Sequence, residues 1–596
     1  MKSRHSNRLV LALFLSSVFL LRAVSNADKP DWCGLWAWGG GAYISRTNRP
    51  WYKGTFVATS WSKLEPEPGR FNWRAIDHGL ERAASNGLYV ALKVYHAQAS
   101  PAWLYENGVP RVRMKHRRYG KALSCPYYLA PAYKRYLVRM IRAVAEHIDT
   151  YPPHIRRHLI AVQGVQGSTG DPHPYVGHLE DRQYWISSKS PEWENWTKQI
   201  FRVYWDAYKA KQPRIGLILK PYKWMDDWVL ENMPGAWRKT HALAQGYHLN
   251  NEMNCDWQWN KYKGFHDGWA IRSRGEFTHA PGMRKGPGSW FYRAPVWHMY
   301  WHCLWSLTYG MDTLNLSGKT LIKGNAYKPH VKAFTFFTKY AGYKDARDSK
   351  GAWCAFRDGL DSQDLKRFPE DRFGAFEEGK NPQRYLNIAK AFSRYGAEQS
   401  DPIVYRWMFD CMVKRTAVND VGLNIWPDNY GMFLTQHDPR GTSQGYWRVG
   451  STNEPYGRFA RGFDYRAGKH AMCFDIDDGF FFDRPLAGAY PVRVRVVYFD
   501  KGRGAWALKY DAVGRPMRTA AIVRKTNTGR WKEKVVVIRD GHFGNRCRHR
   551  TDLMLVNMDT EDDIFHMIEL TRATGDRKGH WGARGRSRKA ELGSRK

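Results

Sequence analysis

Apolar residues follow two alternating spacings over the first 345 residues. Short apolar runs of the length and composition of buried strands are separated by segments with helical spacing, such as Tyr133, Leu137, Met140 and Val144. The predicted strands are residues 34–38, 55–60, 89–95, 159–165, 215–220, 242–248, 269–274 and 311–316. Eight strand–helix units predict a closed (β/α)8 barrel, an α/β fold whose active site lies at the carboxyl ends of the strands.

The pattern changes after the predicted barrel, which we assign to residues 28–345. Residues 346–400 read as a mainly helical, loop-rich connector. Residues 401–574 contain short alternating runs separated by glycine turns, which is typical of an antiparallel β-sandwich. The final residues, 575–596, are basic and almost free of apolar side chains, so we expect a disordered tail.

The beginning of the chain has the features of an export signal. Lys2, Arg4 and Arg8 precede an apolar run over residues 9–21, and small residues follow at 25–27. The run is too short to span a membrane comfortably. We therefore expect residues 1–27 to be a signal peptide and the mature protein to be secreted or periplasmic, with an uncleaved anchor as the alternative.

The charge of the chain indicates the kind of partner it attracts. Lysine and arginine number 94 against 56 acidic residues, for a net charge of +38. Such a surface concentrates polyanions, and an exported protein meets sulfated or carboxylated polysaccharide more readily than nucleic acid. The 28 tryptophans also suit sugar binding, because aromatic rings supply flat apolar faces. A basic surface without any ligand is the alternative.

A short stretch of sequence carries the most specific signal. Residues 55–77 combine an apolar strand, a loop with Pro66, Pro68 and Gly69, and the start of an amphipathic helix, and residues 101–104 read Pro-Ala-Trp-Leu. This wording resembles retaining glycoside hydrolases of clan A, particularly the β-galactosidase-like families. The resemblance implies a barrel that cleaves sugar chains without a cofactor. The predicted sandwich resembles the jelly-roll accessory modules that follow many such barrels.

The resemblance implies a nucleophilic glutamate at the end of the seventh strand. Glu276 occupies that position beside Arg274, whose cation would favour the charged form that a nucleophile requires. Arg274 is itself a candidate for binding substrate. The alternative is that Glu276 forms a salt bridge with Arg272 or Arg274 at the rim of the barrel.

The fourth strand departs from the family pattern. Gln166 stands where the resemblance implies the acid/base glutamate, and an amide cannot donate a proton as an acid does. Asp171 in the following loop, or Glu252 after the sixth strand, could supply the second carboxyl group that retention requires about 5–5.5 Å away. Otherwise the barrel lacks the acid and only binds sugar. Glu252 could also simply cap a helix or hold a loop.

Several further residues are candidates for substrate binding. The loop after the third strand offers His96 for a hydrogen bond and Trp103 for ring stacking, although both could instead be structural. A basic run from Arg111 to Lys121 lies on the same predicted rim and suits sulfate or carboxylate; a solvated face is the alternative. The binding candidates are Gln166, His96, Trp103, Arg117, Arg118, His248, Trp257 and Arg274.

Other chemistries are poorly supported. The eight cysteines lack zinc-ligand spacing, although one or two disulfides are compatible with export. No metal is expected, apart from a weak candidate for structural Ca²⁺ at Asp475–Gly479 that lacks the further EF-hand ligands. The preferred function is retaining hydrolysis of an anionic polysaccharide such as a sulfated galactan. A carbohydrate-binding protein with a degenerate glycosidase barrel is the alternative, and a nucleic-acid binder is the third hypothesis.

Overall fold

The computed structural model describes most of both predicted domains. The described residues are 29–38, 41–116, 120–168, 173–220, 225–240, 273–277, 295–308, 310–317, 321, 325, 327–360, 364–376, 382–397, 429–451, 453–481 and 489–573. The predicted signal peptide (1–27) and basic tail (575–596) lie outside them and stay predictions. None of the described helices combines the length and apolar composition needed to cross a membrane.

Eight parallel strands close into a barrel in the order β1-β11-β10-β9-β8-β6-β3-β2, as predicted. They are β1 (Gly34–Trp38), β2 (Tyr52–Ser60), β3 (Tyr89–Tyr95), β6 (Leu159–Gln163), β8 (Gly216–Leu219), β9 (Trp237–Thr240), β10 (Ser273–Phe277) and β11 (Thr313–Ser317). The sixth strand differs from the prediction, because β9 ends just before residues 242–248. That predicted segment lies outside the described residues.

Alternation along the strands separates the inside of the barrel from its outer wall. The interior cluster contains one residue from each of six strands: Trp36, Phe56, Ala91, Ala161, Ile218 and Trp237. The residues that alternate with them, such as Leu35, Val57 and Leu92, belong to the large core beneath the surrounding helices. Successive side chains of a strand point to opposite faces, which explains why neighbouring residues join different clusters.

The surrounding helices begin and end where the sequence provides the appropriate residues. Those around the barrel are α2 (Trp61–Leu64), α3 (Arg74–Ser85), α4 (Trp103–Glu106), α5 (Pro131–Asp149), α6 (Pro153–Arg156), α7 (Pro191–Tyr208), α8 (Asp226–Asn232), α12 (Pro295–Thr308) and α14 (Val331–Tyr340). The Ser190 side chain accepts a hydrogen bond from Trp193 N and caps α7, with Pro191 at its first position. Gly87 follows α3 with a φ of +70°, which glycine adopts without strain.

The basic run after the third strand is a sheet rather than the predicted rim loop. Strand β4 (Arg111–His116) pairs in antiparallel fashion with β5 (Ala122–Pro126) and with β7 (Gly177–Leu179). Its burial alternates, with Val112 and Met114 buried between exposed basic residues. The sequence analysis missed this strand because the density of charge hid its alternation.

The second domain is a two-layered β-sandwich, as predicted. Its strands are β12 (Gly351–Ala355), β13 (Tyr430–Met432), β14 (Leu434–Gln436), β15 (Gln444–Val449), β16 (Arg458–Gly462), β17 (Ala471–Ile476), β18 (Tyr490–Phe499), β19 (Ala505–Ala512), β20 (Arg515–Arg524), β21 (Trp531–Gly541), β22 (Leu553–Asn557) and β23 (Ile564–Arg572). The strand order runs from β13 to β14, and these two strands are separated in the chain only by Phe433. Between β21 and β19 the sheet is held by one pair, Ala512 and Gly541, so it divides there into two layers.

The start of the sandwich corrects the predicted boundary at residue 401. Strand β12 lies within the predicted helical connector and pairs with both β13 and β23. The connector does contain helices, including α15 (Glu370–Phe373) and α16 (Pro382–Ala391). The β domain therefore takes one of its strands from before the connector helices, which composition along the chain did not reveal.

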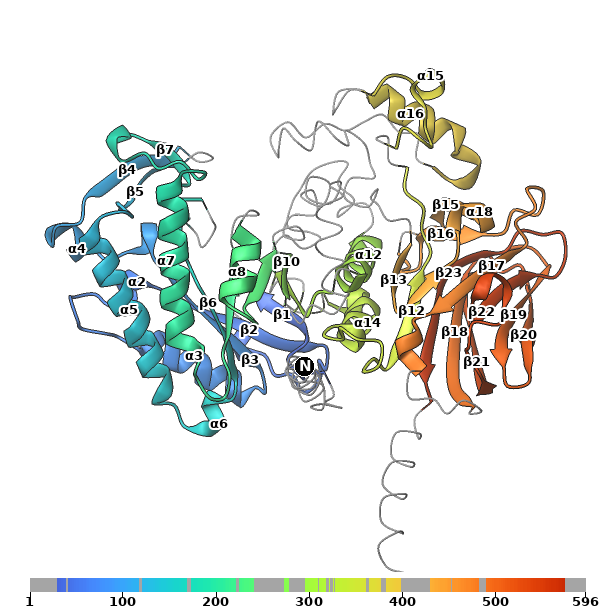
Figure 1. The fold of residues 1–596 in the computed structure, drawn as a ribbon, viewed down its shortest axis with the longest axis horizontal. Coiled ribbons are helices and arrows are strands. Elements are labelled where there is room, and N and C mark those ends of the chain that lie inside the picture. Colours follow the sequence, from blue (N-terminus) through green and yellow to red (C-terminus); the bar gives the residue numbers. More distant parts are fainter. Residues whose placement is uncertain are drawn as a thin grey trace, which may run out of the picture.

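The barrel and the sandwich pack through two barrel helices (Figure 1). Helices α12 and α14 lie between the barrel and strands β12 and β13. Trp301 on α12 contacts Phe459 of the sandwich edge to face, and Phe336 on α14 contacts Trp353 in the same way. One apolar core extends across both domains, since all four of these residues belong to it.

Six cysteines lie within the described residues: Cys33, Cys125, Cys303, Cys354, Cys473 and Cys547. All six are buried, and no disulfide joins any two of them. The two remaining cysteines, Cys255 and Cys411, lie outside the described residues. The suggestion of one or two disulfides is therefore wrong for these six.

Candidate active site at the carboxyl end of the barrel

The loop that follows the fourth barrel strand is held by several hydrogen bonds. Gln166 is completely buried, and its Nε2 donates to the backbone carbonyl of Lys220, after β8, at 2.6 Å. The Gln166 carbonyl accepts a hydrogen bond from Trp196 Nε1 on α7 at 3.4 Å. Its side-chain Oε1 has no hydrogen-bond partner among the described residues. Residue 166 is thus fixed on two sides, with one buried acceptor remaining.

His96 supports the same loop from the end of the third strand. Its Nε2 lies 2.8 Å from the carbonyl of Val165, and its Nδ1 lies 2.9 Å from the hydroxyl of Tyr133 on α5. A carbonyl can only accept, so Nε2 carries the proton and Nδ1 accepts from Tyr133. Burial lowers the pKa of His96 to about 4, so the ring is neutral. Both nitrogens are therefore occupied, which favours the structural alternative over sugar binding.

Trp103 also packs inside the protein. It is only 6% exposed, and its Nε1 donates to the carbonyl of Glu65 at 3.0 Å. Its ring contacts Trp61 and Tyr136 edge to face. The structure thus supports the packing alternative that the sequence left open, because a sugar could stack on this ring only after displacing its neighbours.

The strand register gives the position of the predicted nucleophile. Glu276 is the fourth of the five residues of β10, near its carboxyl end. It pairs with Asn315 on β11, and Asn315 pairs with Trp36 of the interior cluster. Arg274 precedes Glu276 by two residues and pairs with Thr313. Both residues therefore occupy strand positions in the interior rows of the barrel, while Gly275 pairs with Leu314 of the outer core.

Two of the basic residues on the rim have acidic partners. Arg113 forms an ion pair of 2.7 Å with Asp181, and its hydrogen bonds hold the pKa of Asp181 below the ordinary value. Lys115 lies 3.8 Å from Glu180. The basic run from Arg111 to Lys121 therefore offers less charge to a bound anion than the sequence predicted, because acidic neighbours compensate Arg113 and Lys115.

The remaining candidates lie outside the described residues: Asp171, Glu252, Arg117, Arg118, His248 and Trp257. Their assignments stay predictions. Among the described residues no group of three or more His, Cys, Asp or Glu side chains could hold a metal ion. Asp475–Gly479 lies within these residues, so the suggested calcium site gains no support from the structure.

Three contributors to this site were missed by the sequence analysis. The rings of Tyr133 and Trp196 stack on each other with their centroids 5.8 Å apart. The Lys220 carbonyl accepts the hydrogen bond from the Gln166 amide. Helical spacing had placed Tyr133 on the core face of a helix. No sequence signal linked it to His96, because the two residues are 37 positions apart and meet only in the folded barrel.

Comparison with known proteins bears on the first half of the barrel. Residues 54–159 match a glycoside hydrolase family described as beta-galactosidase. Beta-galactosidase Pbg of Clostridium perfringens is 30% identical over 105 residues, which cover 17% of this chain and 15% of that protein. Beta-galactosidase BgaA of Thermus sp. is 36% identical over 92 residues, 15% of this chain and 14% of that protein.

These curated relatives are therefore matched over only about 15% of their length. Among solved structures, the beta-galactosidase of the psychrophilic Marinomonas ef1 is 13% identical with a TM-score of 0.34, over 51% of this chain and 59% of that one. The strand order of the present structure, rather than this likeness, establishes the barrel. Over residues 54–159, from β2 to the first residue of β6, the chain is similar in sequence to the β-galactosidase family of glycoside hydrolases, and the predicted resemblance is confirmed.

Proposed function

We propose that this protein is an exported glycoside hydrolase that cleaves a polysaccharide with retention of anomeric configuration. The substrate class is anionic, such as a sulfated galactan, in keeping with the net charge of +38. The observation that carries the proposal is the combination of a β-galactosidase-like segment with a glutamate in an interior row near the end of the seventh barrel strand. Active sites of such barrels lie at this end.

The proposed reaction has two steps at the anomeric carbon. Glu276 attacks that carbon and forms a glycosyl-enzyme bond, while the bond to the leaving oxygen breaks and a carboxylic acid protonates that oxygen. The acid, now a carboxylate, then takes a proton from water, and the oxygen of that water replaces Glu276 at the anomeric carbon. Asp171 and Glu252 are the two candidates for this group.

Gln166 is assigned to binding rather than proton transfer. An amide has no proton to exchange at neutral pH, so it cannot alternate between acid and base. Its Oε1 is an acceptor at a fixed position, because Nε2 is held by the Lys220 carbonyl. We assign this oxygen to a sugar hydroxyl.

A non-catalytic carbohydrate-binding protein is the second candidate. The observation in its favour concerns Gln166. A buried amide stands where the resemblance implies the acid, and its hydrogen bond to the Lys220 carbonyl holds it there. A barrel that had lost the acid would keep such a binding surface without turnover.

The test begins with the purified full chain on a panel of sulfated and neutral galactans and on aryl galactosides. Reducing ends measure hydrolysis, and proton NMR of the first product shows its anomeric form. We expect retained configuration and a loss of roughly a thousandfold or more in kcat for Glu276→Gln, with binding preserved. Absence of turnover by the wild type on the whole panel, with binding intact, would identify the carbohydrate-binding alternative.

The acid is identified with leaving groups of different basicity. Asp171→Asn and Glu252→Gln are compared on an alkyl galactoside, whose leaving group needs protonation, and on a dinitrophenyl galactoside, whose leaving group does not. Loss of the acid should slow the first substrate about 10²–10⁴-fold and change bond cleavage in the second little. A variant that loses both substrates equally is not the acid, and the other carboxylate then remains.

A further inference from the structure

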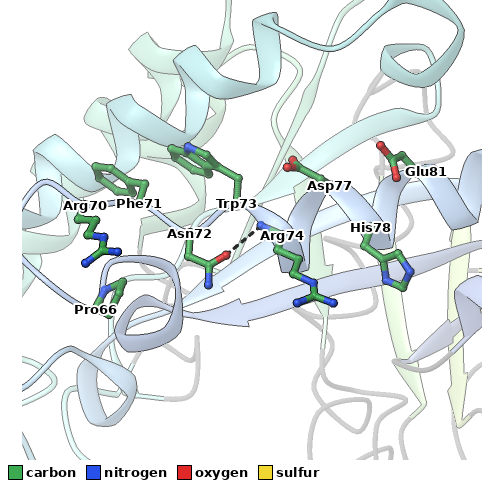
Figure 2. A pocket seen from close by; sticks show the side chains of 9 residues that line it. All are labelled: Pro66, Arg70, Phe71, Asn72, Trp73, Arg74, Asp77, His78 and Glu81. Carbon is green, nitrogen blue, oxygen red and sulfur yellow. Dashed lines mark hydrogen bonds between the residues drawn. The ribbon is translucent and has the colours of Figure 1, made fainter.

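Two hollows lie on the outer, helical layer of the barrel, one beside the loop between β2 and α3 and the other along α5. One, of about 770 Å³, is lined by the loop before α3 and by the first turns of that helix (Figure 2). The other, of about 660 Å³, follows the exposed face of α5 from Pro131 to Glu146. Neither includes a residue assigned to the reaction.

The loop over residues 65–73 connects the two hollows. Glu65 forms a buried ion pair with Arg139, which lines the hollow on α5, and the next residue, Pro66, lines the other hollow. At the far end of the loop, Trp73 stacks on His147 of α5 at 4.1 Å. The hollows therefore adjoin along one side of α5.

The hollow on α5 is strongly basic. Its lining has four cations, Lys134, Arg135, Arg139 and Arg142, against the single carboxylate of Glu146. Arg139 is paired with Glu65, and Lys134 donates to Gln199. Arg135 and Arg142 are exposed. They are seven residues apart, which is two turns, or about 10.5 Å, along one face of the helix.

The hollow before α3 combines both signs of charge with aromatic rings. Figure 2 shows Asp77 and Glu81 along one side of α3, and Arg74 and His78 along the other. Phe71 and Trp73, which also line it, stack on each other at 4.9 Å. Carboxylates accept hydrogen bonds from hydroxyl groups, whereas arginines bind sulfate or carboxylate.

We propose that these adjoining hollows form an accessory site that holds a sulfated or carboxylated polysaccharide outside the barrel mouth. The proposal rests on the substrate class of the proposed function. The anionic groups of the polysaccharide lie against Arg135 and Arg142. Its hydroxyl groups meet Glu81 and Oδ2 of Asp77, because Oδ1 of Asp77 already accepts hydrogen bonds from His147 and Tyr151. A nucleic acid fits less well, because its phosphates would face Asp77 and Glu81 while few hydroxyl donors would meet them.

Binding of size-defined heparin to the full-length chain tests the site, with dissociation constants measured at several salt concentrations. Arg135→Gln/Arg142→Gln is expected to weaken binding about tenfold and to reduce its salt dependence. Arg515→Gln/Arg524→Gln is the matched control, since it removes two exposed arginines from β20 of the sandwich. Equal losses in the two pairs, or no loss in the first, would overturn the proposal.

Two further measurements define the ligand and the extent of the site. Arg74→Gln should weaken heparin binding about threefold; unchanged binding would refute the contribution of the hollow beside α3. Single-stranded DNA that binds more tightly than heparin, and loses this binding with Arg135 and Arg142, would overturn the assignment to polysaccharide. Cleavage of a small neutral aryl galactoside should be the same in the arginine variants and the wild type. Because heparin binding is read without turnover, failure of the proposed hydrolysis is distinguishable from failure of this site.

Discussion

The imidazole of His96 donates from Nε2 to the backbone carbonyl of Val165 at 2.8 Å. The end of the third barrel strand thereby holds the loop that follows the fourth. Val165 immediately precedes Gln166, so this contact supports the position at which the resemblance implies the acid/base glutamate. The arrangement makes His96 a positioning residue in the proposed reaction.

Removing the Tyr133 hydroxyl, which fixes the His96 ring, should disturb the position of Gln166 without leaving a large cavity in the core. Tyr133→Phe leaves Nδ1 of His96 without its donor in a fully buried site. We expect a loss of about 1–2 kcal/mol in the free energy of unfolding, measured by urea denaturation, and a fall in kcat larger than any change in KM.

Tyr208→Phe is the matched control, because it removes a hydroxyl from a buried tyrosine at the last position of α7, several turns along the helix from Trp196 and the loop that Trp196 contacts. If both variants lose stability equally and both retain full kcat, Tyr133 is only structural. The positioning role of His96 is then wrong.

A carboxylic acid at position 166 should recover proton donation. In Gln166→Glu, the protonated side chain can donate to the Lys220 carbonyl as the amide does, whereas the ionised form would face that oxygen at close range. Burial and this contact together raise its pKa, as a general acid requires. Added to the Asp171 or Glu252 variant that proves acid-deficient, it should restore alkyl galactoside hydrolysis about tenfold or more.

The dinitrophenyl galactoside serves as the control substrate, because its cleavage needs no proton donor and should not respond. A gain of the same size in the wild-type background would contradict the existing acid. It would show instead that the chain lacks one, in agreement with the binding-protein alternative.

The join between the domains depends on a buried carboxylate. Glu569 on β23 forms an ion pair of 2.6 Å with Arg495, another of 2.7 Å with Lys339 of α14, and accepts a hydrogen bond from Tyr340 at 2.5 Å. Burial alone would raise the pKa of Glu569, but Arg495 and Lys339 hold it below its ordinary value. Glu569→Gln leaves Arg495 with only the partly exposed Glu533, 3.4 Å away, and should destabilise the protein by about 3 kcal/mol.

Calorimetry is the appropriate measurement, because separate transitions for barrel and sandwich would reveal weakened coupling. Glu67→Gln is the control, since its pair with Arg70 is exposed on both sides and should contribute within about 0.5 kcal/mol. A single unshifted transition for Glu569→Gln would contradict the role of this carboxylate.

Acid should weaken the same interface through His566. This histidine on β23 lies 3.0 Å from the hydroxyl of Tyr300 on α12, and burial lowers its pKa to about 3. The unfolded chain takes up the proton near pH 6.5, well above the folded value. Stability from this group is therefore complete above pH 6.5 and is lost as the pH falls from there toward 3, by about 1.4 kcal/mol per pH unit.

His566→Gln keeps a polar side chain that can form a hydrogen bond with Tyr300 but cannot take up the proton. The difference in unfolding free energy between wild type and variant should therefore shrink as the pH falls from 7 to 4. A difference independent of pH would contradict this prediction, because it would show that His566 has the same pKa in the folded and unfolded protein.

The sequence predicted the repeating parts of this fold well. Strands β1 and β3 have the predicted bounds. These strands are buried and bounded by turns or polar residues, so their apolar pattern follows directly from their surroundings. The strand β12 was missed because it joins the sandwich from the far side of the connector helices, and β4 because its exposed face is almost wholly basic.

The sequence by itself determined the class of both domains, the resemblance to glycoside hydrolases and the position of Glu276 near the end of a strand. Only the tertiary structure decided which partners His96, Trp103 and Gln166 have, since these partners lie far away in the chain. Periodicity reports which face of an element is buried, because burial acts on every turn or alternate residue. It carries no information about which two elements bring a donor to an acceptor, and contacts of that kind hold these three side chains in place.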